Sequence, residues 1–405
     1  MTGLTTTRRE ALVGTAAIGM GLSIGSASAG STSTAANPTA KAEVETKEQD
    51  GSAKMPIICL EEHVNDVAVA QATMTAFAAQ IPYFSGLGSR FREDPARFPT
   101  DRPSLTFVPD SIKIAAAPLS VRLAAMDAAG IDMQVMSLSN TPQLAPAEHG
   151  VDLIKAANDR LASAAKDHPG RLSAFFTLPW QDPDAAAREA ERCVKELRLP
   201  ATLLSGRPHD EKFIDDERFD AVLAQLARLD APIYIHPGPP LEAVRKPYYG
   251  GFNTEVDARF PLFGWGWHHE AGIQVIRLIL SGALDRHRNL KIISGHWGEM
   301  VPFYLQRLDD TMPREVTGLS RTISQTYRDQ VWVGPSGMLD LPHFLFIREI
   351  MGIDRVVFSI DYPYLTMSGA RAWLEKLPIA DHEKEAFAWR NASKLLGVKV
   401  NTAGS

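Results

Sequence analysis

The sequence predicts an α/β protein with the architecture of a (β/α)8 barrel, the TIM barrel. Between residues 55 and 400, short apolar runs alternate with longer amphipathic segments, which is the pattern of parallel strands joined by helices. Eight such runs can be counted, and eight strand–helix units fit one closed barrel. Four of the runs end in a Glu, His or Asp residue, a type that is costly to bury without a partner. Because catalytic residues gather at the carboxyl ends of barrel strands, the pattern predicts one shared site there.

Each predicted strand is a short apolar run that polar or turn residues bound on both sides. The first run, Ile57-Ile58-Cys59-Leu60, opens the folded region. The remaining seven predicted strands follow along the chain at residues 131–138, 172–178, 201–204, 232–236, 290–296, 331–333 and 355–361.

The segments between the strands have the length and periodicity of helices, and Gly130 is a typical residue for ending one of them. Helices are predicted at residues 67–80, 119–129, 151–167, 184–197, 217–229, 269–284, 301–309 and 341–351, with extra C-terminal helices at 368–376 and 381–396. Two long loops, 81–114 and 237–267, follow the first and fifth strands. Loops of this length usually form lids or binding loops, although a structural cover of the barrel mouth or a subunit contact would fit as well.

The composition narrows the possible partners of the protein. The chain has 405 residues, of which 22% are charged, and a formal net charge of -6, so it lacks the basic character of a nucleic-acid binder. After the first 29 residues, no apolar run is long enough to span a bilayer. The two cysteines, Cys59 and Cys193, lie in a predicted strand and a predicted helix, so we expect two buried free thiols rather than a disulfide.

Residues 1–29 have the layout of a signal peptide. Thr7-Arg8-Arg9 precedes an apolar stretch at 11–24, and Ala27-Ser28-Ala29 offers a cleavage site for a signal peptidase. The arginine pair favours the twin-arginine route, with an ordinary Sec leader as the alternative. We therefore expect an exported protein, periplasmic or secreted. Residues 30–54 have the composition of a disordered linker, the barrel is expected over 55–400, and 401–405 form a short tail.

The residues at the strand ends predict a metal site. Residues two apart in a strand share a face, so Glu61 and His63 should point the same way and Glu62 the other way. His236 and Asp361 follow two other predicted strands. Two imidazoles with two carboxylates suit one divalent ion, zinc or manganese first and magnesium as a further option. A single His after a strand is more often a hydrogen-bonded rim residue. Here a fourth strand also ends in such a residue, His296, and the four strand ends together favour a metal site.

Several segments carry a family resemblance. Leu60-Glu61-Glu62-His63, Gly295-His296-Trp297-Gly298-Glu299 and Phe358-Ser359-Ile360-Asp361-Tyr362-Pro363 resemble segments of the amidohydrolase-related (amidohydrolase 2) decarboxylases. These include γ-resorcylate, 2,3-dihydroxybenzoate, 5-carboxyvanillate and aminocarboxymuconate-semialdehyde decarboxylases. The resemblance spans the whole predicted barrel.

Carried over to this chain, the resemblance implies that Glu61, His63, His236 and Asp361 are the metal ligands and that His296 is an active-site residue beside the metal.

Arg307 matches an arginine that reaches substrate across a subunit interface in that family, so a homodimer or homotetramer is expected. The alternative for Arg307 is an ion pair with Glu299 or Asp309 on a helix face. For Glu299 itself we expect only a favourable position at a helix start. The fourth strand with its continuation, residues 201–207, has no lysine that could bridge two metals, which favours a single ion.

The preferred hypothesis for function is nonoxidative decarboxylation of a hydroxylated aromatic or related unsaturated carboxylic acid. Asp361 would donate the proton, its pKa tuned by burial and the ion, and His296 would orient the substrate oxygen or assist the proton. Arg307, with one of Arg90, Arg92 or Arg97, could bind the carboxylate of this small-molecule substrate.

Two other hypotheses remain open at this point. The same ligands could serve a mononuclear hydrolase of a lactone, ester or amide, with Asp361 as general base and His296 stabilising the oxyanion. Export weighs slightly toward hydrolysis, because aromatic-acid decarboxylases are usually cytoplasmic. A noncatalytic barrel used for binding would be marked by a missing ligand, and none is missing here.

Overall fold

The protein was analysed as a computed structural model that describes residues 54–400, apart from residues 93, 107 and 210. The predicted leader, the predicted linker up to residue 53 and the predicted tail lie outside the described residues. Within the described part of the chain, no helix is both long and apolar enough to cross a membrane.

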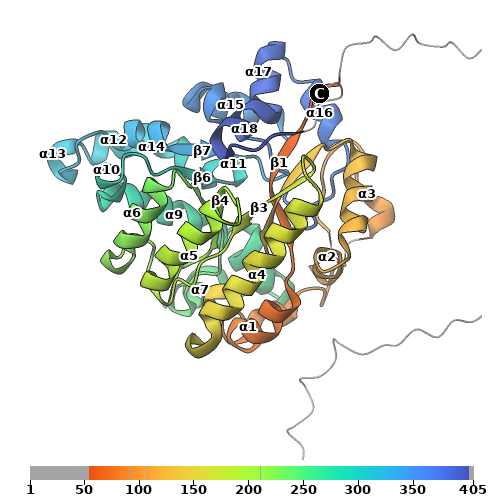
Figure 1. The fold of residues 1–405 in the computed structure, drawn as a ribbon, viewed down its shortest axis with the longest axis horizontal. Coiled ribbons are helices and arrows are strands. Elements are labelled where there is room, and N and C mark those ends of the chain that lie inside the picture. The colour runs from red at the N-terminus through yellow and green to blue at the C-terminus, as the bar shows by residue number, and fades with distance from the viewer. Residues whose placement is uncertain (1–53, 93, 107, 210, 401–405) are drawn as a thin grey trace, which may run out of the picture. The chain divides into compact units, whose positions relative to one another are not determined.

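The centre of the fold is a sheet of seven parallel strands that pair in chain order, as successive strand–helix units do (Figure 1). Nearly every strand residue is buried, because helices cover the outer face of the sheet and strand side chains pack against one another on the inner face. The strands are β1 (Ile58–Val64), β2 (Met133–Leu138), β3 (Leu172–Phe176), β4 (Ala201–Ser205), β5 (Ile233–His236), β6 (Ile292–Ser294) and β7 (Val331–Val333). These seven lie at the places that the sequence predicts.

The eighth predicted strand, residues 355–361, is not a regular strand. It forms single parallel bridges, from Val356 to Val333 of β7 and from Ser359 to Leu60 of β1. Backbone bonds from the N–H of Leu60 to Phe358 and from the N–H of His63 to Tyr362 join the segment to β1, and between them a side-chain carboxylate takes the place of backbone pairing. Glu62 accepts hydrogen bonds from the backbone N–H groups of Ile360 and Tyr362, at 3.0 and 3.3 Å. The segment therefore joins the two outer strands of the sheet without extending its ladder.

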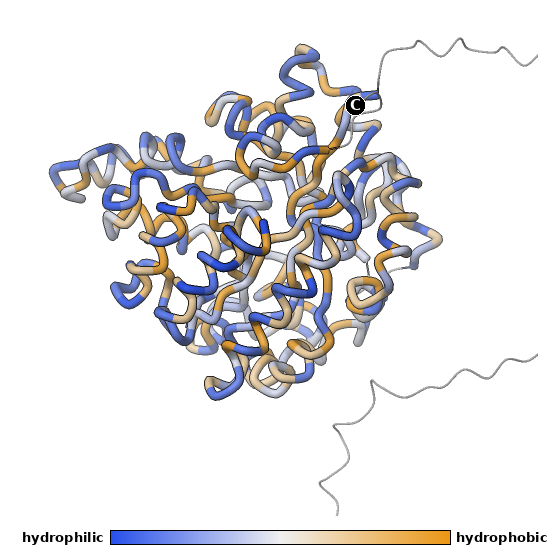
Figure 2. Tube along the Cα trace, viewed as in Figure 1, coloured by the Kyte–Doolittle hydropathy of each residue, from blue (hydrophilic) through white to orange (hydrophobic). Residues whose placement is uncertain are grey.

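Helices surround the sheet, and their outer turns alternate between hydrophobic and hydrophilic stretches (Figure 2). The main covering helices are α3 (Leu119–Ala129), α4 (Ala147–Asp167), α5 (Pro183–Lys195), α6 (Asp220–Arg228), α9 (Gly266–Leu280), α12 (Val301–Thr311), α14 (Ile323–Gln330) and α15 (Leu341–Met351). Shorter helices and turns are α10 (Ala283–Arg286), α11 (His296–Glu299), α13 (Arg314–Thr317), η3 (Pro142–Leu144), η4 (Glu217–Phe219) and η6 (Ile353–Arg355). The C-terminal region contains α16 (Ala370–Glu375), α17 (Asp381–Glu385), η7 (Ala386–Arg390) and α18 (Asn391–Leu396).

The two predicted long loops contain helices. After α1 (Val67–Gln80), the first connection holds η1 (Pro82–Gly86), η2 (Pro95–Arg97) and α2 (Val108–Ala115). The second holds α7 (Glu242–Tyr249), α8 (Thr254–Arg259) and the π-turn η5 (Phe260–Gly264). Prolines and N-capping residues in these connections break the helices into pieces too short to show a clear period in the sequence.

Alternate strand residues form two separate cores. Ile58 and Leu60 of β1 pack inward with residues of the other strands and with α18, whereas Ile57 and Cys59 pack outward against helices. Inward packing of this kind fills the interior of a barrel. Both Cys59 and Cys193 are buried and free, as predicted.

Candidate metal centre

The structure brings the four predicted ligands together. Each of Glu61, His63, His236 and Asp361 offers one ligand atom, and these four atoms lie within 4.8 Å of one another. His63 Nε2 is 3.0 Å from Asp361 Oδ1, and His236 Nε2 is 3.5 Å from Glu61 Oε1. Three different parts of the fold thus supply one cluster, at the carboxyl ends of β1 and β5 and at the end of the 355–361 segment.

Local backbone geometry aims the two carboxylates. Glu61 and Asp361 have φ angles of 63° and 69°, in the left-handed region that non-glycine residues rarely adopt. At Glu61 the pairing of β1 with β2 shifts register, as at a β-bulge, and a bulge re-aims a side chain. Glu62 points away from the cluster, as predicted, and its carboxylate accepts a bond from Gln134 Nε2 at 3.0 Å.

The hydrogen bonds around the cluster leave one atom free on each of three ligands. Glu61 Oε1, His63 Nε2 and Asp361 Oδ1 are buried and make no hydrogen bond. They face other ligand atoms of the cluster instead, His63 Nε2 with Asp361 Oδ1 and Glu61 Oε1 with His236 Nε2. The second ring nitrogen of each histidine ligand has a hydrogen-bond partner. His63 Nδ1 lies 3.1 Å from Ser137 Oγ, and His236 Nδ1 lies 2.9 Å from the carbonyl oxygen of Pro237.

Glu61 Oε2 accepts hydrogen bonds from the hydroxyls of Tyr234 and Ser336. Buried polar atoms without partners are costly, and imidazoles whose second nitrogen is held by the protein are typical metal ligands. The residues therefore fit a divalent transition-metal ion.

The charges at the site suit a bound cation. Burial raises the pKa of Glu61 to about 7; His296 opposes this rise, and Asp361 adds to it. Burial also lowers the pKa of His236 well below its ordinary value, and His63 and His296 add to that effect. His236 is therefore neutral at pH 7, which is the form that binds metal, and the buried carboxylates require a positive charge nearby.

A second group of side chains lies beside the ligands. His296 Nε2 is 4.0 Å from Asp361 Oδ2, and His296 Nδ1 is 2.8 Å from Glu299 Oε1. The other Glu299 oxygen lies 3.0 Å from His268 Nδ1, and the two imidazole rings are 4.3 Å apart. Burial works to lower the pKa of His296, but Glu299, Glu61 and Asp361 together outweigh burial and raise it to about 10. In the metal-free site these carboxylates therefore favour the charged form of His296.

Glu299 has a larger role than the sequence suggested, and the sequence did not indicate a role for His268. Glu299 is buried and binds two imidazoles, a role that its position at a helix start did not suggest. His268 lies in α9 next to His269, a position that carries no strand-end signal, and only the fold brings it to Glu299.

The chain passes this group in a left-handed turn. Five consecutive residues have positive φ angles, and only one of them is glycine: His296 (45°), Trp297 (59°), Gly298 (81°), Glu299 (52°) and Met300 (67°). A left-handed conformation costs a non-glycine residue roughly 1–2 kcal/mol. Strain of this kind concentrates at functional sites, where the surrounding packing holds it. Here the left-handed turn brings the side chains of His296 and Glu299 into contact.

The ligands open into a cavity of about 310 Å³. His63, His236, His296 and Asp361 all contribute to its lining. Arg259, Trp267 and Tyr364 line it too, together with a set of apolar side chains from α1, η1 and α2. The loop arginines proposed from the sequence, Arg90, Arg92 and Arg97, are exposed and do not line this cavity. Arg259 from α8 is the arginine that does, which the sequence did not single out.

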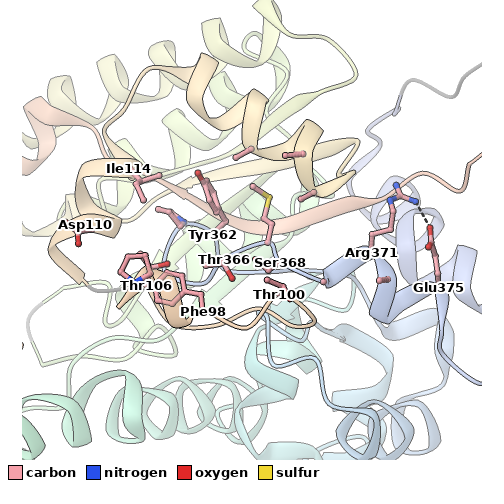
Figure 3. A pocket seen from close by; sticks show the side chains of 18 residues that line it. Phe98, Thr100, Thr106, Asp110, Ile114, Tyr362, Thr366, Ser368, Arg371 and Glu375 are labelled. Carbon is pink, nitrogen blue, oxygen red and sulfur yellow. Dashed lines mark hydrogen bonds and ion pairs between the residues drawn. The ribbon is translucent and has the colours of Figure 1, made fainter. Parts of the chain in front are cut away.

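A larger hollow of about 810 Å³ lies between the first long connection and α16 (Figure 3). Phe98, Ile114 and Tyr362 point into it, and an Arg371–Glu375 ion pair lies at one end. None of the four ligands lines this hollow. The smaller cavity, with its convergent polar groups, is therefore the candidate active site.

Arg307 is exposed on α12 and lies outside the cavity of its own chain. The alternative ion pairs are also not seen among the described residues. Glu299 is occupied by the two histidines, and Asp309 accepts hydrogen bonds from Ser324. No lysine is among the residues that line the cavity.

Comparison with known proteins identifies the family. Residues 116–398 match the amidohydrolase family. The chain belongs to this family. It is 31% identical over 358 residues to the decarboxylase orsB of Emericella nidulans, and the match covers 85% of this chain and 98% of that protein. The resemblance seen in the sequence is thereby confirmed.

Solved structures of decarboxylases share the fold. The 5-carboxyvanillate decarboxylase of Sphingomonas paucimobilis is 28% identical, has a TM-score of 0.74, and covers 85% of this chain and all of its own. The dihydroxybenzoic acid decarboxylase of a Polaromonas species is 26% identical with a TM-score of 0.70, over 85% of this chain and 97% of its own. That structure contains manganese and the inhibitor 2-nitroresorcinol. These relatives are decarboxylases of hydroxylated aromatic acids.

Proposed function

We propose that this protein is a metal-dependent nonoxidative decarboxylase of a hydroxylated aromatic carboxylic acid. The observation that carries the proposal is the set of three buried ligand atoms without a hydrogen bond, on Glu61, His63 and Asp361, beside a cavity of about 310 Å³ that His63 and Asp361 line. The decarboxylase relatives share the fold that builds this site.

Glu61, His63, His236 and Asp361 would hold one divalent ion, with manganese favoured by the relative that contains it and zinc or magnesium as alternatives. When bound, the ion supplies positive charge that attracts the substrate carboxylate and its neighbouring hydroxyl oxygen. Tyr234 and Ser336 orient Glu61 from behind.

The proton transfer falls to Asp361 and His296. Asp361 lines the cavity, and its carboxyl group gives a proton to the ring carbon that bears the substrate carboxylate. The bond between that carbon and the carboxylate then breaks, its electron pair restores the aromatic ring, and carbon dioxide leaves. His296, fixed by Glu299, donates a hydrogen bond to the substrate hydroxyl oxygen. After carbon dioxide leaves, His296 passes a proton from solvent through one water to Asp361, whose Oδ2 is 4.0 Å away.

The proposal includes the complete architecture. We infer a (β/α)8 barrel in which residues 355–361 are the eighth strand, with the long connections after β1 and β5 forming its mouth. The single bridges of this segment to β7 and β1 support that assignment.

We also propose a homodimer or homotetramer in which Arg307 serves a neighbouring subunit. α12, which carries Arg307, and the neighbouring α15 expose large apolar side chains: Phe303, Tyr304, Leu345 and Phe346, of which Phe303 is 70% exposed. Phe303 and Phe346 are in ring contact at 6.0 Å. An exposed apolar patch of this kind is typical of an interface. Phe303→Glu should dissociate the oligomer in sedimentation, whereas Phe252→Glu, at an exposed aromatic elsewhere, should not.

A predicted export route completes the proposal: cleavage of a leader after residue 29 and a periplasmic or secreted product. Sequencing the amino terminus of the mature protein tests it.

The function is tested by metal analysis with a substrate panel. The protein, loaded with manganese, is offered dihydroxybenzoates and 5-carboxyvanillate, followed for carbon dioxide release, beside lactones and aryl esters. We expect about one ion per chain and carbon dioxide release that Asp361→Asn abolishes and Asp152→Asn, at an exposed site on α4, does not. Hydrolysis without carbon dioxide release would contradict the proposal and favour the hydrolase. Failure to bind an ion would contradict both.

A further inference from the structure

The cavity is larger than one aromatic ring needs. Its volume is about 310 Å³. An apolar protein cavity of about 150 Å³ accommodates benzene. A substrate ring whose carboxylate reaches the ligand cluster therefore leaves a considerable part of the cavity to be filled by something else.

One part of the lining is apolar, and we call it the apolar wall. It consists of Met74, Phe77, Phe84, Leu105 and Ile112. Phe77 and Phe84 contact each other with ring centroids 6.1 Å apart. Met74, Leu105 and Ile112 are 56%, 46% and 38% exposed, so the wall continues from the cavity to the surface. These five side chains offer no hydrogen-bond partner to a hydroxyl or carboxylate placed against them.

Helix α1, which supplies two residues of this wall, is unusual for a surface helix. None of its 14 residues is ionisable, although Val67 and Met74 are more than half exposed. Surface helices normally carry charged residues on the side that faces water. The absence of charge on α1 agrees with an apolar group entering along it.

We infer, on the basis of the proposed decarboxylase, that the substrate ring carries an apolar substituent, an alkyl chain of several carbons, that lies on the apolar wall. Met74, Leu105 and Ile112 then determine specificity. The carboxylate and hydroxyl groups of the substrate face Glu61, His63, His236 and Asp361. The alkyl chain of the substrate runs past Met74 toward solvent. Each methylene that leaves water on the wall strengthens binding about fourfold, which corresponds to about 0.8 kcal/mol.

The experiment measures binding separately from turnover. Calorimetry on the manganese-loaded protein compares resorcinol with 5-methyl-, 5-propyl- and 5-pentylresorcinol, the products that decarboxylation of the matching acids would release. Affinity should rise about fourfold per added methylene until the chain reaches solvent. The matching 6-alkyl-2,4-dihydroxybenzoates are then followed for carbon dioxide release, where kcat/KM should rise in the same order.

Two variants of α1 locate the effect. Met74→Glu places a charge in the wall and should reduce the ratio of pentyl to unsubstituted affinity to near one. Val67→Glu adds the same charge to the same helix outside the cavity lining and should leave the ratio as in the wild type.

The possible outcomes separate the two proposals. An affinity independent of chain length in the wild type, or a chain-length dependence that Met74→Glu does not alter, would overturn the alkyl-chain inference. Binding that follows chain length without any carbon dioxide release would support the apolar wall and overturn the decarboxylase.

Discussion

Glu62 offers the sharpest test of how the fold holds its metal ligands. Its buried carboxylate accepts three hydrogen bonds: Oε1 from the N–H of Ile360, and Oε2 from the N–H of Tyr362 and from Gln134. The first two donors flank Asp361 directly in the chain. Glu62 therefore fixes the backbone on both sides of a proposed metal ligand without touching the ion itself.

The magnitude of a Glu62→Gln change follows from counting acceptors. An amide has one oxygen, so whichever way it turns, at least one backbone N–H faces an NH2 group and loses its partner. A buried backbone N–H left without its partner costs about 1–3 kcal/mol. Displacing support behind a metal ligand typically lowers metal affinity about 10- to 100-fold. We expect both effects, because the unpaired N–H lies next to Asp361.

Urea unfolding of the metal-free protein and competition with a chelator measure these two quantities. Glu315→Gln, at an exposed position on α13, is the matched control and should change neither. A Glu62→Gln protein with unchanged stability and unchanged metal affinity would refute the reasoning that the carboxylate replaces part of a strand.

Three further predictions concern the ligand support, the pH and the loops. Tyr234→Phe removes a hydroxyl that orients Glu61, and chelator competition should show metal affinity about 10- to 100-fold weaker; an unchanged affinity would mean that Ser336 suffices. Glu61 has a pKa raised to about 7 in the metal-free site, so it is protonated below that pH and must lose its proton to bind. Manganese affinity measured between pH 8 and 5.5 should therefore be nearly constant above pH 7 and fall about tenfold per pH unit below pH 7. An affinity that does not change over this range would contradict a raised pKa of Glu61. Glu255 of α8 accepts hydrogen bonds from the N–H groups of Gly88 and Arg90 and so joins the two long connections. Glu255→Gln should speed hydrogen exchange at these two amides. Exchange as slow as in the wild type would show that these hydrogen bonds do not depend on the charge of Glu255.

The clustering of the four candidate ligands could be predicted from the sequence, because these residues follow recognisable buried strands. Glu61, His236 and Asp361 each follow an apolar run, and the chemistry of Glu and Asp beside buried residues demands a partner. The contributions of Tyr234 and Ser336 could not be predicted, since each is an ordinary residue whose role depends on which strand end lies opposite.

The misses have local physical causes. The carboxylate of Glu62 takes the place of backbone pairing between β1 and the 355–361 segment, and period-2 alternation carries no sign of this. The helix α14 was missed although its start was readable: Thr322 and Gln325 form a capping box. The short helices of the long connections lack the length for periodicity to appear.

The left-handed turn at residues 296–300 also limits what can be transplanted. A designer who copied the side chains of this centre onto an idealised barrel would start from a backbone without positive φ angles, on which His296 and Glu299 could not meet. Glu61 and Asp361 impose the same condition at two other strand ends. Such a graft would have to import three short stretches of main chain and the packing that keeps them bent. A working copy of this centre therefore requires its main-chain conformation as well as its side chains.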